Sequence, residues 1–144
     1  MERSYQYDIV IVGGGTAGVA AAVGATKAGA KTLLVERNAY LGGEATNSGV
    51  NCFCGFYTCG SDPVRVVKGI GQLVLDEMRA LGPTIAEEIS ASGNRDIIFQ
   101  PEYLKCALDN LLEKEHVDCF LHTVLIGAET VENTIRTIQC ADDE

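Results

Sequence analysis

Three glycines near the start of the chain have the spacing of a phosphate-binding turn. In GGGTAG, Gly13 permits a tight turn, Gly15 lets a backbone approach a pyrophosphate, and Gly18 lets a helix pack closely on a strand. Glu36 stands eighteen residues after Gly18. Its carboxylate can accept hydrogen bonds from a nucleotide ribose and would repel a 2′-phosphate. The pattern predicts a dinucleotide site, with a structural glycine-rich turn as the alternative.

These residues need two strands and a helix to position them. Residues 9–12 form a β-branched run typical of a strand buried on both faces of a parallel sheet. Residues 16–28 are small and apolar enough to be a helix on that sheet, with its N-terminus at the pyrophosphate. Residues 32–35 form a second strand that ends at Glu36. We therefore expect an α/β fold with a Rossmann-like parallel sheet, in one dinucleotide-binding domain over residues 1–144.

The composition and charge of the chain exclude some classes of binding partner. The chain has 144 residues, of which 47% are hydrophobic and 22% charged, as in ordinary globular proteins. A net charge of −9 argues against nucleic acid or an anionic membrane as a partner. The first residues, MERSYQ, lack the features of a signal peptide, and no apolar run is long enough to span a membrane. We expect a cytoplasmic protein.

Two further helices are predicted in the second half of the chain. Asp62-Pro63 is a start signal for a helix running to residue 81, whose apolar residues recur at helical spacing. Pro101 and Glu102 open a helix over residues 101–114, where both suit the N-terminal turn.

The remaining segments predict short extended pieces. Residues 84–93 are ambiguous and read as a short helix followed by a loop, and residues 94–100 contain a short edge strand. We expect residues 117–121 to be the third parallel strand. Two extended stretches then follow, joined by a turn around Glu132-Asn133. His122 lies between these segments, where a structural or surface role is favoured over catalysis.

Four short motifs, GGGTAG, VER, LGG and AT, occur in this order between residues 13 and 46. With them the chain resembles the N-terminal FAD-binding part of FAD-dependent oxidoreductases related to glutathione reductase and the fumarate reductase flavoprotein. The likeness is greater to less characterised members that read CGFYT soon after LGG. Domains that bind only NAD do not typically carry the double-glycine loop, so the resemblance implies FAD as the cofactor. It implies the following cofactor-binding residues: Gly13, Gly15, Thr16, Gly18, Glu36, Arg37, Gly42, Gly43 and Thr46.

The resemblance also implies what these residues hold. The first glycine turn holds the FAD pyrophosphate, and Glu36 holds the adenosine ribose with Arg37 beside the adenine. The loop at Gly42-Gly43 approaches the phosphate and ribityl side. The backbone of Val124 or Leu125 meets the adenine edge, and the extended stretches near the C-terminus correspond to an antiparallel excursion in the family.

The cysteines are the second group able to do chemistry. The chain has six, and without an export signal we expect thiols rather than disulfides. Cys54 and Cys59 have the spacing of the redox dithiol of disulfide reductases, but Cys54 lies eleven residues past Gly43, which is the wrong register. Plain thiols in a loop near the flavin, a redox dithiol and metal ligation all stay open for Cys52, Cys54 and Cys59. Metal is the weakest alternative, because no further CxxC pair or nearby His completes a zinc set, and no metal is expected.

The resemblance covers about residues 7–140 but only the front part of a family member. The return strand with its second Gly/Asp signature and the substrate domain are absent. We expect the FAD-binding portion of a flavin-dependent oxidoreductase whose small-molecule substrate and catalytic residues stay unknown. An open sheet edge favours self-association or a complementing chain. The alternatives are a nonenzymatic FAD- or NAD-binding module, an inactive fragment, or a thiol redox protein using Cys54 and Cys59.

Overall fold

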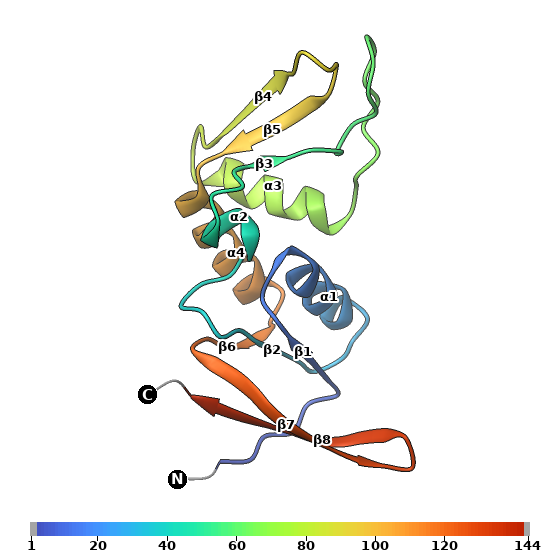
Figure 1. Ribbon diagram of the computed structural model, residues 1–144, viewed down its shortest axis with the longest axis vertical. Coiled ribbons are helices and arrows are strands. Elements are labelled where there is room, and N and C mark those ends of the chain that lie inside the picture. The colour runs from blue at the N-terminus through green and yellow to red at the C-terminus, as the bar shows by residue number, and fades with distance from the viewer. Residues whose placement is uncertain (1–2, 143–144) are drawn as a thin grey trace.

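The computed structural model describes residues 3–142. Its elements form a parallel three-stranded sheet, an antiparallel three-stranded sheet and a two-stranded hairpin. Figure 1 shows the parallel sheet in the middle of an elongated molecule, with the antiparallel sheet at one end and the hairpin at the other. This arrangement confirms an α/β fold with a Rossmann-like parallel sheet and an antiparallel excursion near the C-terminus.

The parallel sheet contains the predicted strand–turn–helix–strand unit. Its strands are β1 (Ile9–Val12), β2 (Thr32–Val35) and β6 (Asp118–Phe120), in the order β1-β2-β6. Helix α1 (Thr16–Lys27) connects β1 to β2, and α4 (Pro101–Lys114) precedes β6. In the register Val12 pairs with Val35 and Val35 with Phe120, so the three strands end at the same edge of the sheet. The predicted helix over residues 101–114 and the third parallel strand are both confirmed.

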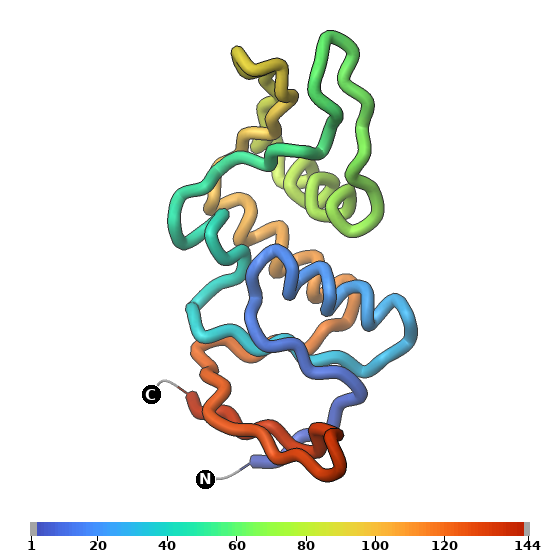
Figure 2. Tube along the Cα trace, turned by 45° about the vertical axis from the view of Figure 1, so that its right-hand side comes forward, coloured from blue at the N-terminus to red at the C-terminus, as the bar shows by residue number. Residues whose placement is uncertain are grey.

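The main core lies between this sheet and its helices. Val23 of α1, Leu34 of β2 and Leu104 of α4 are fully buried in one cluster, which Met78 of α3 (Ile70–Ala80) joins. Both views show α1 and α4 on one side of the sheet and the hairpin on the other (Figures 1 and 2). The helices therefore cover one face of the sheet with a continuous apolar layer.

The expectation that residues 9–12 are buried on both faces is wrong. Ile9, Val10 and Val12 are 40%, 37% and 48% exposed, whereas every residue of β2 is buried. β1 lies at one of the two edges of the sheet, and of its residues only Ile11 packs against the main core. A β-branched run does not distinguish a central strand from an edge strand whose outer side is uncovered.

The antiparallel sheet corrects two further expectations. It follows the short helix α2 (Glu44–Asn47) and contains β3 (Cys52–Phe53), β4 (Ile85–Ile89) and β5 (Arg95–Phe99), in the order β3-β5-β4. Residues 85–89, expected to be helix and loop, form a strand that pairs along its whole length with β5. Strand β5 was expected at an edge but lies in the centre, and its Ile97 is completely buried.

Helix α3 is shorter than predicted, since it begins at Ile70 and not at Asp62. Gly69 has φ +68°, outside the helical region, and stands at the N-cap. The preceding residues form an extended excursion instead, in which the Val66 N–H donates to the Phe56 carbonyl at 2.8 Å and the Thr58 N–H to the Val64 carbonyl at 2.8 Å. The backbone hydrogen bonds of this segment are satisfied across the excursion rather than along a helix.

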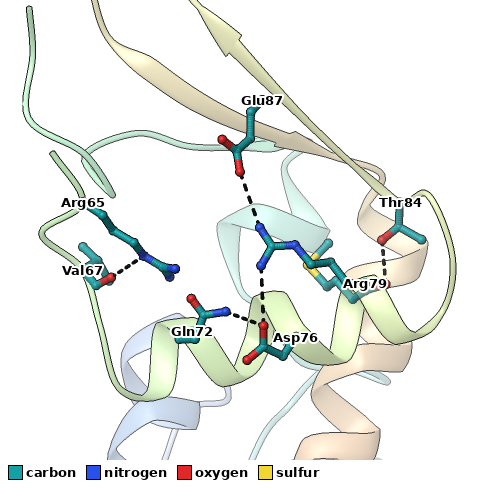
Figure 3. Close-up of polar contacts among 8 residues, drawn as sticks. Arg65, Val67, Gln72, Asp76, Arg79, Thr84 and Glu87 are labelled. Carbon is teal, nitrogen blue, oxygen red and sulfur yellow. Dashed lines mark hydrogen bonds and ion pairs between the residues drawn. The ribbon is translucent and has the colours of Figure 1, made fainter. Parts of the chain in front are cut away.

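Polar contacts join α3 to the antiparallel sheet (Figure 3). Arg79 lies between Asp76 on its own helix, at 3.5 Å, and Glu87 on β4, at 3.4 Å. The buried Thr84 hydroxyl donates to the Met78 carbonyl at 2.8 Å, and the same carbonyl accepts from the Leu81 N–H at 3.1 Å at the end of α3. Together these contacts fix where β4 begins relative to the helix.

Strands β7 (Thr123–Val131) and β8 (Thr134–Asp142) form the hairpin. Glu132 and Asn133 both have positive φ, of 48° and 61°, as a two-residue type I′ turn requires. The predicted turn at Glu132-Asn133 is confirmed.

Candidate functional site

The first glycine turn lies where β1 passes into α1. Gly13 has φ +106°, which favours glycine, and Gly15 is the N-cap of the helix with extended backbone. A Cβ on Gly18 would lie 1.7 Å from the Gly13 carbonyl oxygen and 3.6 Å from the Ile11 side chain. Gly18 is therefore required for the helix to lie against the turn and the strand.

The second glycine loop is held against the first. The Gly42 N–H donates to the Gly14 carbonyl at 2.9 Å, and Gly15 and Gly42 form a parallel bridge. A Cβ on Gly43 would lie 3.0 Å from the Gly15 Cα. Both Gly42 and Gly43 have positive φ, of 109° and 58°, so side chains would be strained there as well as crowded. The structure brings the two predicted glycine loops into direct contact.

Glu36 is buried at the end of β2 and is already hydrogen-bonded. Its Oε2 accepts from the Gly14 N–H at 2.6 Å, and its Oε1 accepts from the Asn38 N–H at 2.8 Å and from the Asn38 side-chain amide at 2.6 Å. A carboxylate offers about four acceptor positions, so these three bonds leave roughly one for a ligand. The acid connects the first glycine turn with the loop that follows β2.

The link between β6 and β7 is attached to the same loop. The Thr123 N–H donates to the Glu36 carbonyl at 3.0 Å, and the His122 N–H donates to the Asn38 carbonyl at 3.2 Å. These bonds bring Val124 and Leu125, the two residues expected at an adenine edge, beside Glu36. The side chain of His122 is exposed, and only its backbone takes part in these contacts.

These segments surround a cleft of about 570 Å³ at the carboxyl ends of β1 and β2. Parallel sheets of this type bind ligands at that edge. Among the predicted residues the cleft contains Gly13, Glu36, Arg37 and Gly43, together with Val124 and Leu125. It also contains Asn38, Glu44 and Thr123, which sequence reasoning missed, and Asn47 and Ser48 from the stretch that follows the second glycine loop.

The other predicted site residues do not line this cleft. Gly15, Gly18 and Gly42 shape the two loops behind it. The buried Thr46 hydroxyl donates to the Leu41 carbonyl at 2.7 Å and lies 3.2 Å from the Gly43 carbonyl, so it stabilises the second loop from within. Thr16 is exposed on the first turn of α1.

All six cysteines are free thiols. Cys54 Sγ lies 3.6 Å from Cys52 Sγ, whereas Cys59 Sγ donates to Asn94 Oδ1 at 2.8 Å. The contact between thiols thus pairs Cys54 with Cys52 and not with Cys59. Burial, helped by the nearby charges of Asp109 and Glu36, raises the pKa of the Cys119 thiol to about 11. A protonated thiol of this kind is unreactive at neutral pH.

None of the helices in residues 3–142 combines the length and the apolar character needed to cross a lipid bilayer.

Comparison with known proteins gives a family match over almost the whole chain. The profile of the family described as FAD dependent oxidoreductase matches residues 8–144. Thiamine thiazole synthase from Aeropyrum pernix is 28% identical, over 99% of this chain and 52% of that protein. Mitochondrial dihydrolipoyl dehydrogenase from Caenorhabditis elegans is 50% identical over 42 residues, which are 29% of this chain and 8% of that protein.

The fold is also similar to that of solved structures of larger proteins. The 3-ketosteroid-Δ4-(5α)-dehydrogenase from Rhodococcus jostii superposes with a TM-score of 0.63 at 20% identity, over 99% of this chain and 43% of that chain. At this identity the likeness concerns the fold alone. The chain spans about half the length of the thiamine thiazole synthase that it matches.

Proposed function

This chain belongs to the FAD dependent oxidoreductase family, and we propose that its two touching glycine loops, together with Glu36, hold the FAD. The chain is the flavin-binding portion of such an oxidoreductase, and FAD is its cofactor. We assign the pyrophosphate to the turn at Gly13–Gly18, the adenosine ribose to Glu36 and the adenine to the region of Arg37, Val124 and Leu125.

The main support for this proposal is that the two loops touch through glycines, so no side chain covers the N-terminus of α1 and an anion can bind there. Gly15 offers no side chain to cap the helix, and the first turn contains no acidic residue. A Cβ on Gly15 would meet only the Gly43 Cα, at 3.9 Å, so the space over the turn is open. Free N–H groups and the helix dipole stabilise a pyrophosphate at such a position.

The rest of the cleft fits the adenosine part of the cofactor. Glu36 keeps about one free acceptor position, which suits one ribose hydroxyl. The negative charge of Glu36 disfavours a 2′-phosphate in the same place. The backbone at Val124 and Leu125 borders the cleft and supplies polar groups for an adenine edge.

Bound FAD supplies a ring that accepts a hydride or electrons from a substrate. The residues of this chain bind and orient that cofactor, and residues 46–59, which follow the second glycine loop, are our candidate for a wall of the flavin site. We propose a small molecule as the substrate of the whole protein. We assign no catalytic residue within this chain.

Replacing Gly15 by Val tests the proposed position of the pyrophosphate. Gly15 has φ −67°, which any residue adopts, and its neighbourhood admits a side chain, so the free protein should fold normally. The valine would occupy the space assigned to the pyrophosphate. We expect FAD affinity to fall by at least about tenfold, equivalent to about 1.4 kcal/mol, in a titration followed by flavin fluorescence.

Gly24→Ala is the matched control on the same helix, since its added Cβ would make only an ordinary contact with Ile70 at 3.6 Å. It should leave FAD affinity unchanged. Unchanged affinity in Gly15→Val would overturn the assignment of the pyrophosphate. Saturable NAD binding without FAD binding would instead favour a nonenzymatic dinucleotide module.

The alternative of a thiol redox protein using Cys54 and Cys59 gains no support from the structure. Their sulfur atoms have different partners, Cys52 for Cys54 and Asn94 for Cys59. We therefore keep the flavin-binding function as the proposal.

A further inference from the structure

Two cysteines and one carboxylate converge on the antiparallel sheet, outside the cleft at the carboxyl ends of β1 and β2. Cys52 Sγ and Cys54 Sγ are 3.6 Å apart, and a carboxylate oxygen of Asp96 lies with them so that all three ligand atoms are within 4.8 Å of one another. None of the three residues lines the cleft at β1 and β2. Figure 1 shows β3 and β5 beyond α2, at the end of the molecule opposite the hairpin.

The strand register explains why these side chains meet. β3 runs antiparallel to β5, with Cys52 opposite Ile98 and Phe53 opposite Ile97. Cys54 directly follows β3, and Asp96 is the neighbour of Ile97 in β5. Phe53 and Ile97, which alternate with these residues, pack in the core, while the ligand atoms of Cys52, Cys54 and Asp96 gather within 4.8 Å of one another.

One oxygen of the Asp96 carboxylate lacks a partner in the part of the chain that the structure describes. Asp96 Oδ1 is shielded from solvent and makes no hydrogen bond there. An unsatisfied buried acceptor costs about 1–3 kcal/mol, and more if it is charged.

We propose that Cys52, Cys54 and Asp96 bind a thiophilic divalent cation of the zinc class. Zinc binds sulfur at about 2.3 Å and oxygen at about 2.0–2.2 Å, so its tetrahedral ligands lie roughly 3.3–3.8 Å apart. The 3.6 Å between the two sulfur atoms already falls in this range. Calcium and magnesium prefer ligand sets made of oxygen alone, so two thiolates select against both.

The balance of charge and protons supports the same cation. Binding needs both thiols as thiolates, and it releases the two thiol protons to solvent as the sulfur–metal bonds form. Two thiolates and one carboxylate carry three negative charges, which more than offset the double positive charge, and Asp96 Oδ1 gains the partner that it lacks. Three protein ligands leave the fourth tetrahedral position open to water or to an outside ligand.

Cobalt titration of the 144-residue chain, reduced and kept free of oxygen, tests the site. Co²⁺ serves as a coloured substitute for zinc, because tetrahedral thiolate ligation gives intense visible bands and a sulfur-to-cobalt charge-transfer band. We expect about one equivalent to bind, and Zn²⁺ to displace it. Cys52→Ser and Cys54→Ser should each abolish the charge-transfer band or weaken binding by at least about tenfold, a loss that even an outer-shell partner can cause.

Asp96→Asn and Cys59→Ser complete the design. Asp96→Asn keeps the shape of the side chain but removes its charge, and it should also weaken cobalt binding by at least about tenfold. Cys59→Ser removes an exposed thiol that contacts Asn94, and it should bind cobalt as the unsubstituted chain does. Circular dichroism checks that every variant is folded.

Two results would overturn the proposal. One is the absence of cobalt and zinc binding by folded protein whose six thiols are shown to be reduced by titration with a thiol reagent. The other is binding that survives in both Cys52→Ser and Cys54→Ser, which would place the metal elsewhere. A disulfide between Cys52 and Cys54 that forms in air and abolishes metal uptake would support the proximity of the two ligands.

Discussion

Glu36 illustrates, at the scale of one residue, how a carboxylate serves the fold and a ligand together. Its Oε2 accepts from Gly14, twenty-two residues away in the chain, and so holds the first glycine turn at the end of β2. Sequence reasoning predicted Glu36 from its distance to the glycines. It missed Thr123, because the bond from its N–H to the Glu36 carbonyl depends on how separate segments meet in space. It also missed Asn38, although the bonds from Asn38 to the Glu36 carboxylate span only two residues.

Replacing Glu36 by Gln should weaken FAD binding and the fold together. The amide nitrogen of Gln cannot accept the bonds that one oxygen of Glu36 accepts, and hydrogen bonds to charged groups contribute about 1.5–3 kcal/mol. We expect FAD affinity to fall about 10- to 100-fold in titration, and the free energy of unfolding in urea to fall by about 1–3 kcal/mol. Glu113→Gln, on the exposed face of α4, is the control. Wild-type FAD affinity in Glu36→Gln would show that the ribose lies elsewhere.

At the scale of elements, local sequence signals predicted some helices and strands correctly. They failed where pairing with residues distant in the chain determines the secondary structure. The α4 helix begins at Pro101 as predicted, since proline favours the first helical turn. The start of α3 and the strand β4 were predicted wrongly. Gly69 has positive φ, residues 56–67 pair with one another, and β4 is specified by its pairing with β5. No pattern within residues 62–93 reveals these partners.

The glycines of α1 give a prediction at the same scale. Gly18→Ala places a Cβ 1.7 Å from the Gly13 carbonyl oxygen, so the helix must move away from the turn. Overpacking of this kind costs typically about 1–3 kcal/mol, occasionally more. Urea unfolding should show this loss for Gly18→Ala, whereas Gly24→Ala should be neutral or stabilising by up to about 1 kcal/mol through helix propensity. Equal unfolding free energies for the two variants would contradict the packing role of Gly18.

At the scale of the whole molecule, the distribution of burial is uneven. The main core joins α1, β2, α4 and Met78 of α3, and β2 is covered completely. β1 is an edge strand in residues 3–142, and apolar side chains along it stay exposed. The sequence predicted the strand at residues 9–12 and an open sheet edge prone to association, but it did not predict which strand would lie at that edge. The order of strands follows from tertiary pairing rather than from the composition of each one.

An exposed apolar edge of this kind is a template for pairing with another chain, so the protein should self-associate as its concentration rises. Val10→Lys places a charge on β1, where a charged side chain on an edge opposes strand addition. We expect light scattering to show less association for this variant, with FAD affinity unchanged because Val10 does not line the cleft. Val66→Lys is the control, since Val66 is exposed in the excursion before α3. An equal decrease in both variants would indicate a general effect of charge, and undiminished association of Val10→Lys would show that the edge of β1 is not the contact.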